Sequence, residues 1–376
     1  MTSDIHEQVA VHQPKQRGEA GGFLRRTNVL TGSALGIGLS VVTYALGSKL
    51  VPWGTQNEDY SQVGLNALVG ATYVAWVIGF MIGIGAFAGP VRWMLGHDIT
   101  HDDAEYMAGK GQGKWKYWKY TTDHKVVGIQ YLIMALILLG FGGFFAMLIR
   151  TELGVTWSEV FDPNFYNSIV GTHGIVMIIA MIIVIAGPLG NFIMPLMIGA
   201  RDMAFPRLNA LSFWLLFAAV PPLLSNLLLG GIRDGWTVYQ PLGTQAPIGM
   251  IGYQICIITF AFSTGIAGVN LITTIVTMRA RGMTWNRVPI FVIGILAAAI
   301  MGLVWFPMFQ YSQVLAFSDK VVGSSFFIPQ EGGSVWLYEN LFWLLGHPEV
   351  YVIVVPATAA LLELMVVFLR KPLFSY

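Results

Sequence analysis

Eight long apolar runs divide this chain, and shorter polar segments separate them. A helix needs about 20 apolar residues to cross a hydrocarbon core about 30 Å thick. Inside lipid such runs satisfy their backbone polar groups as helices. The pattern therefore predicts an all-α, polytopic transmembrane helix bundle with about eight spans. Their expected limits are 27–49, 66–92, 126–149, 167–199 (broken by Gly187, Pro188 and Gly190), 208–231, 249–278, 289–317 and 340–369.

The polar segments suggest a division into four parts. Residues 1–26 lack the apolar core and cleavage site of a signal peptide, so we interpret them as a polar tail. Residues 27–100 hold the first two spans. Residues 101–125 form a polar linker, charged and aromatic, that we expect along the membrane surface. Residues 126–376 hold the remaining six spans.

The placement of basic residues predicts the orientation. If the N-terminus is inside, the inside segments hold 17 Lys and Arg residues and the outside segments hold four. The positive-inside rule then places both termini in the cytoplasm. We expect an integral protein of a bacterial-type cytoplasmic (inner) membrane. The outside residues are Lys49, Arg150, Arg233 and Lys320.

Composition excludes several classes of protein. Apolar residues make up 55% of the chain and charged residues 11%, and the mean hydropathy is +0.64. Soluble domains carry about 25% charged residues. The net charge of +1 gives no indication of nucleic-acid binding. The single cysteine, Cys256, allows no disulfide framework, thiolate metal site or CxxC haem attachment.

Ionisable residues inside the predicted spans are the first candidates for chemistry, because each is costly in lipid. Two histidines qualify, His173 and His347. His173 stands between small residues, Gly171 and Gly174, which would let a flat macrocycle approach the backbone. Imidazole is a common axial ligand of haem iron. The alternative is a hydrogen-bonded helix histidine near the outer interface.

His347 belongs to a denser polar group. Tyr351 follows it by four residues, so the two side chains share one helix face and can touch. Glu349 points to a different side, and Pro348 removes a backbone donor and bends the helix locally. An imidazole, a phenol and a carboxyl so close together in mid-membrane indicate a functional site. The alternative is a polar kink that neighbouring residues satisfy.

A third group lies near the inner ends of two spans. Asp202 is placed at a helix junction, where it would open to the cytoplasm. Asn191, Asn209 and Ser212 could line a hydrated path leading inward, and Ser212 shares a helix face with Asn209. Alternatively, Asp202 and Asn209 act as helix caps. A buried Glu349 at the far end favours a proton path.

With these residues in hand, the chain resembles subunit I of haem–copper oxidases of the mitochondrial-like type. The segments GTHG, ARDMAFPRLN and GHPEVY carry the resemblance, which covers roughly residues 120–376. It implies that His173 is an axial ligand of a low-spin haem and that His347 is a ligand of the active-site copper. Tyr351 resembles the tyrosine covalently joined to that histidine, which supplies an electron and a proton when dioxygen splits.

The resemblance also implies a proton path and contacts to the haems. Glu349 is similar to the acid at the inner end of the path, which desolvation keeps protonated, and Asp202 to its cytoplasmic mouth. Arg150 resembles the arginine that hydrogen-bonds the formyl group of the low-spin haem. Asn191, Asn209 and Ser212 are similar to residues that line the path, and Trp236 and Trp343 to tryptophans beside the haem propionates and the copper.

The implied cofactors are a low-spin haem, taken as haem a, a high-spin haem and the active-site copper. Two intramembrane histidines cannot ligate all three, so we expect another chain or segment to supply the missing C-terminal helices. The dinuclear copper needs thiolates, which places it in a partner subunit II. The other expected partners are a subunit III, cytochrome c as electron donor, and membrane lipids, but not nucleic acid.

Several alternatives stay open. A quinol-oxidising member of the family would have polar residues where this chain has Phe141, Phe145, Phe165 and Ser168, so cytochrome c is the favoured donor. A nitric oxide reductase would lack the tyrosine at position 351. A non-catalytic scaffold or channel would use the polar groups for packing only. Glu363 lies sixteen residues after His347, about 24 Å along the helix; it either feeds a second proton path or reaches water.

Overall fold

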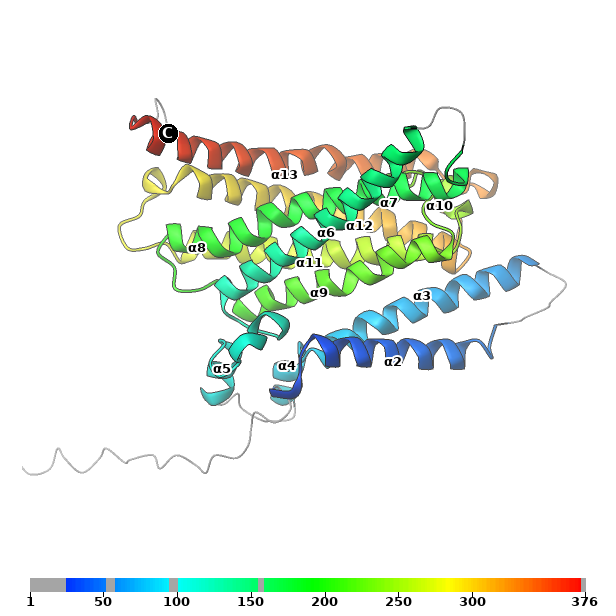
Figure 1. Ribbon diagram of the computed structural model, residues 1–376, viewed down its shortest axis with the longest axis horizontal. Coiled ribbons are helices and arrows are strands. Elements are labelled where there is room, and N and C mark those ends of the chain that lie inside the picture. Colours follow the sequence, from blue (N-terminus) through cyan, green and yellow to red (C-terminus); the bar gives the residue numbers. More distant parts are fainter. Residues whose placement is uncertain (1–24, 52–57, 95–100, 155–158, 373–376) are drawn as a thin grey trace, which may run out of the picture.

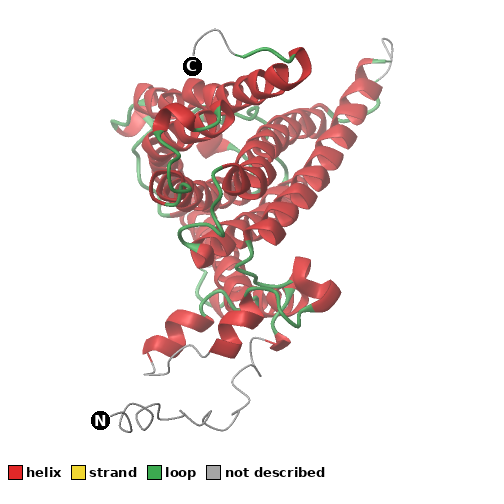
Figure 2. Cartoon of the chain, turned by 90° about the vertical axis from the view of Figure 1, so that its left-hand side faces the viewer, coloured by secondary structure: helices red, strands yellow, loops and turns green. Residues whose placement is uncertain are grey.

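The computed structural model describes residues 25–51, 58–94, 101–154 and 159–372, and the predicted tail lies almost wholly outside them. The described residues form helices and connecting loops without strands (Figures 1 and 2). The α-helices are α2 (Val29–Gly47), α3 (Glu58–Gly83), α4 (Ala88–Met94), α5 (His101–Met107), α6 (His124–Leu153), α7 (Pro163–Val184), α8 (Met194–Met197), α9 (Pro206–Ser225), α10 (Leu242–Gln245), α11 (Met250–Thr277), α12 (Ile290–Val321) and α13 (Val335–Leu369). The shorter turns are η1 (Gly113–Trp118), η2 (Ile185–Ile193), η3 (Asn226–Leu229), η4 (Trp285–Arg287) and η5 (Pro329–Glu331).

Eight helical segments of the described chain are long and apolar enough to cross a membrane, which confirms the predicted fold class. They run alternately in opposite directions, so the start of α2 and the end of α13 lie at the same end of the bundle (Figure 1). This end is called the Asp202 end below, and the opposite one the Arg150 end.

Two span limits differ from the expectation. The second span was expected to reach residue 92, but α3 ends at Gly83. Gly85 has a φ of +87°, a left-handed turn that glycine adopts without strain, and α4 follows separately. The fourth span was expected to break near Pro188, and α7 does end at Val184. The chain continues through the π-helical segment η2 into α8, and the wider π turn accommodates the proline.

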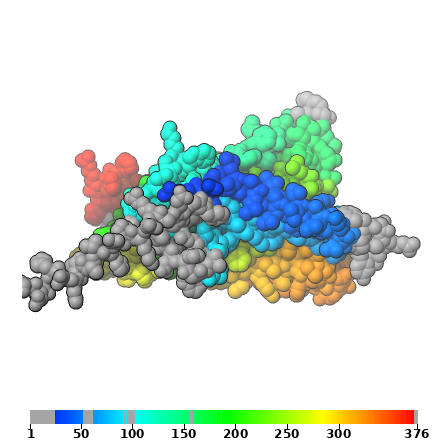
Figure 3. All heavy atoms as spheres, turned by 90° about the horizontal axis from the view of Figure 1, so that it is seen from below, coloured from blue at the N-terminus to red at the C-terminus, as the bar shows by residue number. Residues whose placement is uncertain are grey.

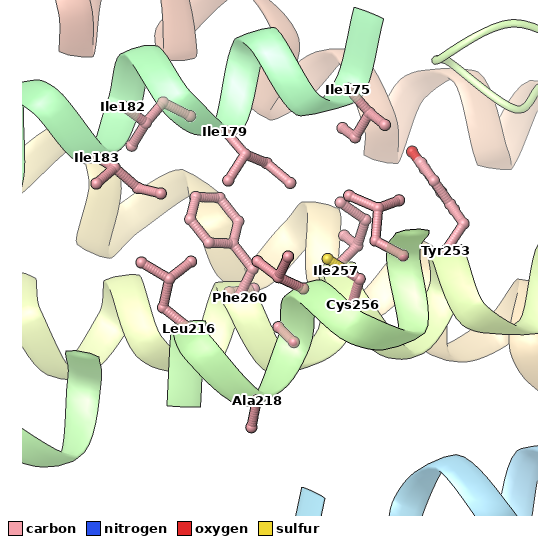
Figure 4. Close-up of a cluster of buried hydrophobic side chains, with 14 of the residues drawn as sticks. Ile175, Ile179, Ile182, Ile183, Leu216, Ala218, Tyr253, Cys256, Ile257 and Phe260 are labelled. Carbon is pink, nitrogen blue, oxygen red and sulfur yellow. The ribbon is translucent and has the colours of Figure 1, made fainter. Parts of the chain in front are cut away.

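Apolar side chains from α7, α9 and α11 make the centre of the bundle (Figure 4). On α7 the isoleucines recur at helical spacing, so they form one stripe that faces the other two helices. The residues labelled in Figure 4 are Ile175, Ile179, Ile182 and Ile183 of α7, Leu216 and Ala218 of α9, and Tyr253, Cys256, Ile257 and Phe260 of α11.

The first two spans form a hairpin on the side of the bundle away from α13 (Figures 1 and 3). Glycines four residues apart on each helix, Gly32 and Gly36 on α2 and Gly79 and Gly83 on α3, let the backbones meet. A Cβ on Gly79 would lie 2.9 Å from the Gly36 Cα. Such small-residue pairs drive helix association in lipid, where apolarity by itself gives no preference between helices.

Helix α3 attaches this hairpin to the rest of the bundle through three polar contacts. The Trp76 indole donates to the Ala218 carbonyl (2.8 Å), and the Asn66 amide donates to the Lys320 carbonyl (3.0 Å). The Tyr73 and Ser225 hydroxyls are 2.7 Å apart. These bonds lie in the apolar interior, where an unpaired donor is costly, so they fix the position of α3 against α9 and α12.

Candidate functional site

The His347 and Tyr351 side chains touch on α13, as their spacing predicts. Their ring centroids are 4.6 Å apart and the planes meet at 70°. Both side chains are exposed, and Tyr351 keeps 45% of its surface accessible. The pair therefore presents an imidazole and a phenol together on an open helix face.

Helix α13 has two different faces. Its buried side chains pack mainly against α12, and they include Phe342, Leu345 and Val352. His347 and Tyr351 lie on the other side, while Glu349 is half-buried on the face of Leu345 and Val352, four and three residues away from it. The helix continues through Pro348 and Pro356, so the register of these side chains is helical throughout.

His173 is half-buried on α7, and its Nδ1 lies 2.8 Å from the Gly142 carbonyl oxygen of α6. This bond orients the ring and leaves Nε2 available to a metal, an arrangement typical of ligating histidines. The flanking glycines serve a different purpose from the one expected. A Cβ at Gly171 would lie 2.8 Å from the Ile232 carbonyl oxygen, so this glycine admits the loop after η3 rather than a macrocycle.

Trp236 connects the two histidine-bearing helices. A Cβ on Gly174, next to His173, would lie 3.0 Å from the Trp236 Cβ. On its other side, the Trp236 ring lies 5.6 Å from Phe342 and 6.2 Å from Trp343 of α13. The Trp343 indole donates to the Tyr239 hydroxyl of the same loop. The loop thus holds α7 and α13 together on the His347 side.

Arg150 occupies the last turn of α6 and is exposed. Its guanidinium forms no ion pair or hydrogen bond with another residue in the described ranges. It stands eight residues beyond Gly142, about 12 Å along the helix from the carbonyl that orients His173.

Asp202 lies between α8 and α9 and is half-buried. Burial raises the pKa of Asp202 above its ordinary value, and the Met203 N–H, 2.7 Å from Oδ1, and the nearby His124 act in the opposite direction. Helix α11 holds this segment in place. The Asn270 side chain accepts from the Phe205 N–H (2.8 Å), and the Thr274 hydroxyl accepts from the Ala204 N–H (2.9 Å).

The other residues of the predicted path, Asn191, Asn209 and Ser212, are all buried. The His124 Nδ1 lies 2.7 Å from the Asn191 carbonyl oxygen, which connects the Asp202 surroundings to η2. The Ser212 hydroxyl donates to the Asn209 carbonyl (2.7 Å). The amide nitrogen of Asn209 is buried and has no hydrogen-bond acceptor within the described part of the chain.

Sequence reasoning missed two hydroxyls that join this group. The Tyr131 hydroxyl of α6 lies 2.8 Å from the Ser212 hydroxyl, and the Ser263 hydroxyl of α11 donates to the Ser212 carbonyl (2.6 Å). Both residues stand in apolar runs without any local signal. In the described ranges, no hydrogen bond continues the group as far as Glu349.

Glu363 has a structural partner that sequence spacing did not suggest. Its carboxylate accepts from the Phe291 N–H of α12 at 3.3 Å. Because Pro289 offers no side-chain cap, Glu363 satisfies one of the free N–H groups at the start of α12.

Each candidate histidine fits a metal as a single ligand. Within the described ranges, no three His, Cys, Asp or Glu side chains are grouped closely enough to hold an ion together. His173 has an oriented ring with Nε2 available, and His347 is exposed beside a phenol. These two imidazoles suit haem iron and copper, which both accept neutral imidazole.

Comparison with known proteins identifies the family. Residues 126–376 match the family described as "Cytochrome C and Quinol oxidase polypeptide I". The chain is 43% identical over 267 residues to "Cytochrome c oxidase subunit 1" of Thermostichus vulcanus, covering 70% of this chain and 48% of that protein. It is 38% identical over 270 residues to "Quinol oxidase subunit 1" of Bacillus subtilis (strain 168), covering 70% and 41%.

The chain thus belongs to the subunit I family of haem–copper oxidases, as the sequence motifs predict. It spans about half the length of the curated relatives it matches. The matched segment starts at Val126, so the hairpin and the whole linker, residues 101–125, precede it.

Proposed function

We propose that this chain is the first part of the catalytic subunit of a proton-pumping cytochrome c oxidase, which reduces dioxygen to water. The observation that carries the proposal is the contact between His347 and Tyr351 on the open face of α13, 4.6 Å between ring centroids. When the two groups are held together in this way, the imidazole can bind a metal and the phenol can donate a proton beside it.

His173 would hold the low-spin haem through Nε2, and His347 would ligate the active-site copper. Arg150 would lie at the edge of the low-spin haem, and Trp236 would contact the haems from the loop between the two helices. When bound, the two haems and the copper supply the electrons and the binding site for dioxygen. The two haems and the copper would need more ligands than these two imidazoles.

Residues of this chain would donate and transfer protons. The Tyr351 phenol oxygen gives up a proton towards the copper side of α13, and the Glu349 carboxyl passes protons from the path towards it. Glu349 is half-buried, and a carboxyl can both accept and release a proton, which suits a relay.

Asp202 collects these protons, and Asn191, Asn209 and Ser212 line the way inward. The unpartnered Asn209 amide supports this path, since water usually satisfies a buried amide that has no protein partner. The Tyr131 and Ser263 hydroxyls add two further polar groups next to Ser212. Water must bridge the step from these hydroxyls to Glu349.

Cytochrome c rather than quinol is the proposed electron donor, although relatives of both kinds match. Phe141 and Phe165 are exposed, and Phe145 is buried, so the surface where a quinol would bind is aromatic. The Ser168 hydroxyl donates to the Asn164 carbonyl of its own helix at 2.7 Å. A quinol head group would find no free polar partner among these residues.

The chain would lie in a membrane and work together with other subunits. The Asp202 end faces the cytoplasm of a bacterial inner membrane, as the distribution of basic residues indicates. A subunit II carries the dinuclear copper that receives electrons from cytochrome c, and a subunit III completes the complex.

The test uses the complete complex purified from membranes. Reduced-minus-oxidised spectra with carbon monoxide should show a low-spin haem and a second, carbon monoxide-binding haem. His347→Ala should abolish oxygen consumption and leave the low-spin haem spectrum intact, while Leu364→Ala, an exposed position on the same helix, should change neither. Unchanged turnover in His347→Ala would contradict the copper assignment, and a complex without haem would favour a scaffold.

A further inference from the structure

The linker before the family segment forms part of the wall around Asp202. A cavity of about 360 Å³ opens beside this residue. Its lining comes from two sources, the family core and the segment that precedes it. The core contributes Asp202, Ala204, Phe205, Pro206, Arg207 and Leu208, and the linker contributes Ala104, Met107 and Thr122.

Hydrogen bonds hold the linker in this position. The Met107 carbonyl accepts from the Thr122 N–H (2.8 Å) and from the Thr121 hydroxyl (3.1 Å), so the chain folds back onto α5. The Tyr120 hydroxyl donates to the Arg207 carbonyl at 2.6 Å, which attaches the linker to the start of α9. Gln130 of α6 donates to two linker carbonyls at 3.1 Å each.

The charged residues near Asp202 come from the family core and the start of α6, and none of those that line the cavity comes from α5. His124 and Asp123 at the start of α6 act on it electrostatically, and Arg207 lines the same cavity. Helix α5 carries three acids, Asp102, Asp103 and Glu105, but it turns uncharged Ala104 and Met107 towards the cavity. The linker therefore narrows the approach to Asp202 without adding a charge to it.

We propose that residues 101–122 regulate proton uptake, because α5 forms the outer wall of the aqueous approach to Asp202 and keeps that wall free of charge. This inference rests on the proposed role of Asp202 as the mouth of the path. It assigns a function to a segment that the family match leaves out.

A charge introduced at position 104 tests the proposal, because Ala104 is exposed and lines the cavity. In the complete oxidase, Ala104→Lys should slow proton uptake about two- to fivefold at low salt, since a cation nearby disfavours protonation of Asp202. Ala104→Glu should move the alkaline limit of turnover to higher pH, and Ala104→Lys to lower pH. Both effects should shrink at high ionic strength.

Two matched variants separate charge from other causes. Ala104→Gln adds bulk without charge, and Ala108→Lys places the same cation on an exposed position after α5 that does not line the cavity. The proposal is overturned if Ala104→Lys and Ala104→Glu match these two controls in rate and pH profile. Asp202→Asn is measured in parallel: normal proton uptake in that variant would refute the path itself, whereas loss of uptake with an unresponsive position 104 would refute only the role of the linker.

Discussion

The polar residues around Ser212 and the His347–Tyr351 pair differ in how far other helices of this chain surround them. Around Ser212, α6 and α11 each contribute a hydroxyl: that of Tyr131 bonds with the Ser212 hydroxyl, and that of Ser263 donates to the Ser212 carbonyl, inside the bundle. His347 and Tyr351 instead contact each other and are otherwise exposed on α13. The first region is enclosed by helices of this chain, whereas the second lies on an exposed helix face.

The difference shows how the two tasks are divided in this fold. A proton path needs polar groups that stay in place and hold water, so several helices must surround it. Under the proposed function His173 and His347 would serve two different metals, so each metal needs further ligands. Trp236 packs between α7 and α13, the helices that carry the two histidines. Substitutions in the two regions should therefore have different consequences.

The largest effect is expected at the open face. Tyr351→Phe removes the phenol hydroxyl but keeps the ring that contacts His347. Oxygen consumption should fall about a hundredfold or more, as expected when a proton donor at the reacting centre is lost. The low-spin haem spectrum should be unchanged. An oxygen electrode measures the rate, and a loss smaller than twofold would show that the phenol takes no part.

A smaller loss is expected at the mouth of the path. Asp202→Asn keeps the shape of the side chain and its contact with the Met203 N–H, but it cannot carry a proton. Proton uptake should fall about tenfold, less than the loss of a donor at the reacting centre because water can still enter the cavity. Stopped-flow measurement with a pH dye gives the rate, and Asn209→Ala should lower it less.

Asp202→Asn should also alter how the stability of the folded protein depends on pH. Burial raises the pKa of Asp202, so the folded state binds this proton more tightly than the unfolded state. This contribution to stability is present at low pH and is lost as pH rises from about 4 through the folded-state pKa. Asp202→Asn should therefore be more resistant to heat than the parent at pH 7, with the difference disappearing near pH 4.

A still smaller effect on rate is expected inside the path. Tyr131→Phe removes one of the two hydroxyls that contact Ser212, whose own hydroxyl still has the Asn209 carbonyl as acceptor. Proton uptake should fall about two- to threefold, and the protein should lose about 1 kcal/mol of stability. Tyr311→Phe, on the exposed surface of α12, serves as the control. Equal behaviour of the two variants would remove Tyr131 from the path.

The smallest effect on turnover is expected at the hairpin. Trp76→Phe removes the indole donor to the Ala218 carbonyl and should destabilise the attachment of α3 by about 1–2 kcal/mol. Limited proteolysis of the loop between α2 and α3 should become faster. Oxygen consumption should stay within twofold, since the hairpin lies on the side away from α13. A large fall in turnover would show that the hairpin supports the redox site directly.

The amino-acid sequence by itself determined the helices and the local pairs. Apolar runs of spanning length appear directly in the chain, and a separation of four residues places His347 against Tyr351 in any helix. The motifs around these residues also indicated the family. Each of these features depends on neighbours in the sequence, which is why they could be predicted.

The tertiary structure decided everything that joins distant segments. No local signal indicated the contacts between these segments: Trp236 between α7 and α13, Tyr131 and Ser263 beside Ser212, Glu363 at the start of α12, and the linker beside Asp202. The physical reason is the lipid. Hydrophobicity indicates that a helix lies in the membrane, but it does not distinguish the face that meets lipid from the face that meets another helix. Close packing and hydrogen bonds across the bundle make that choice.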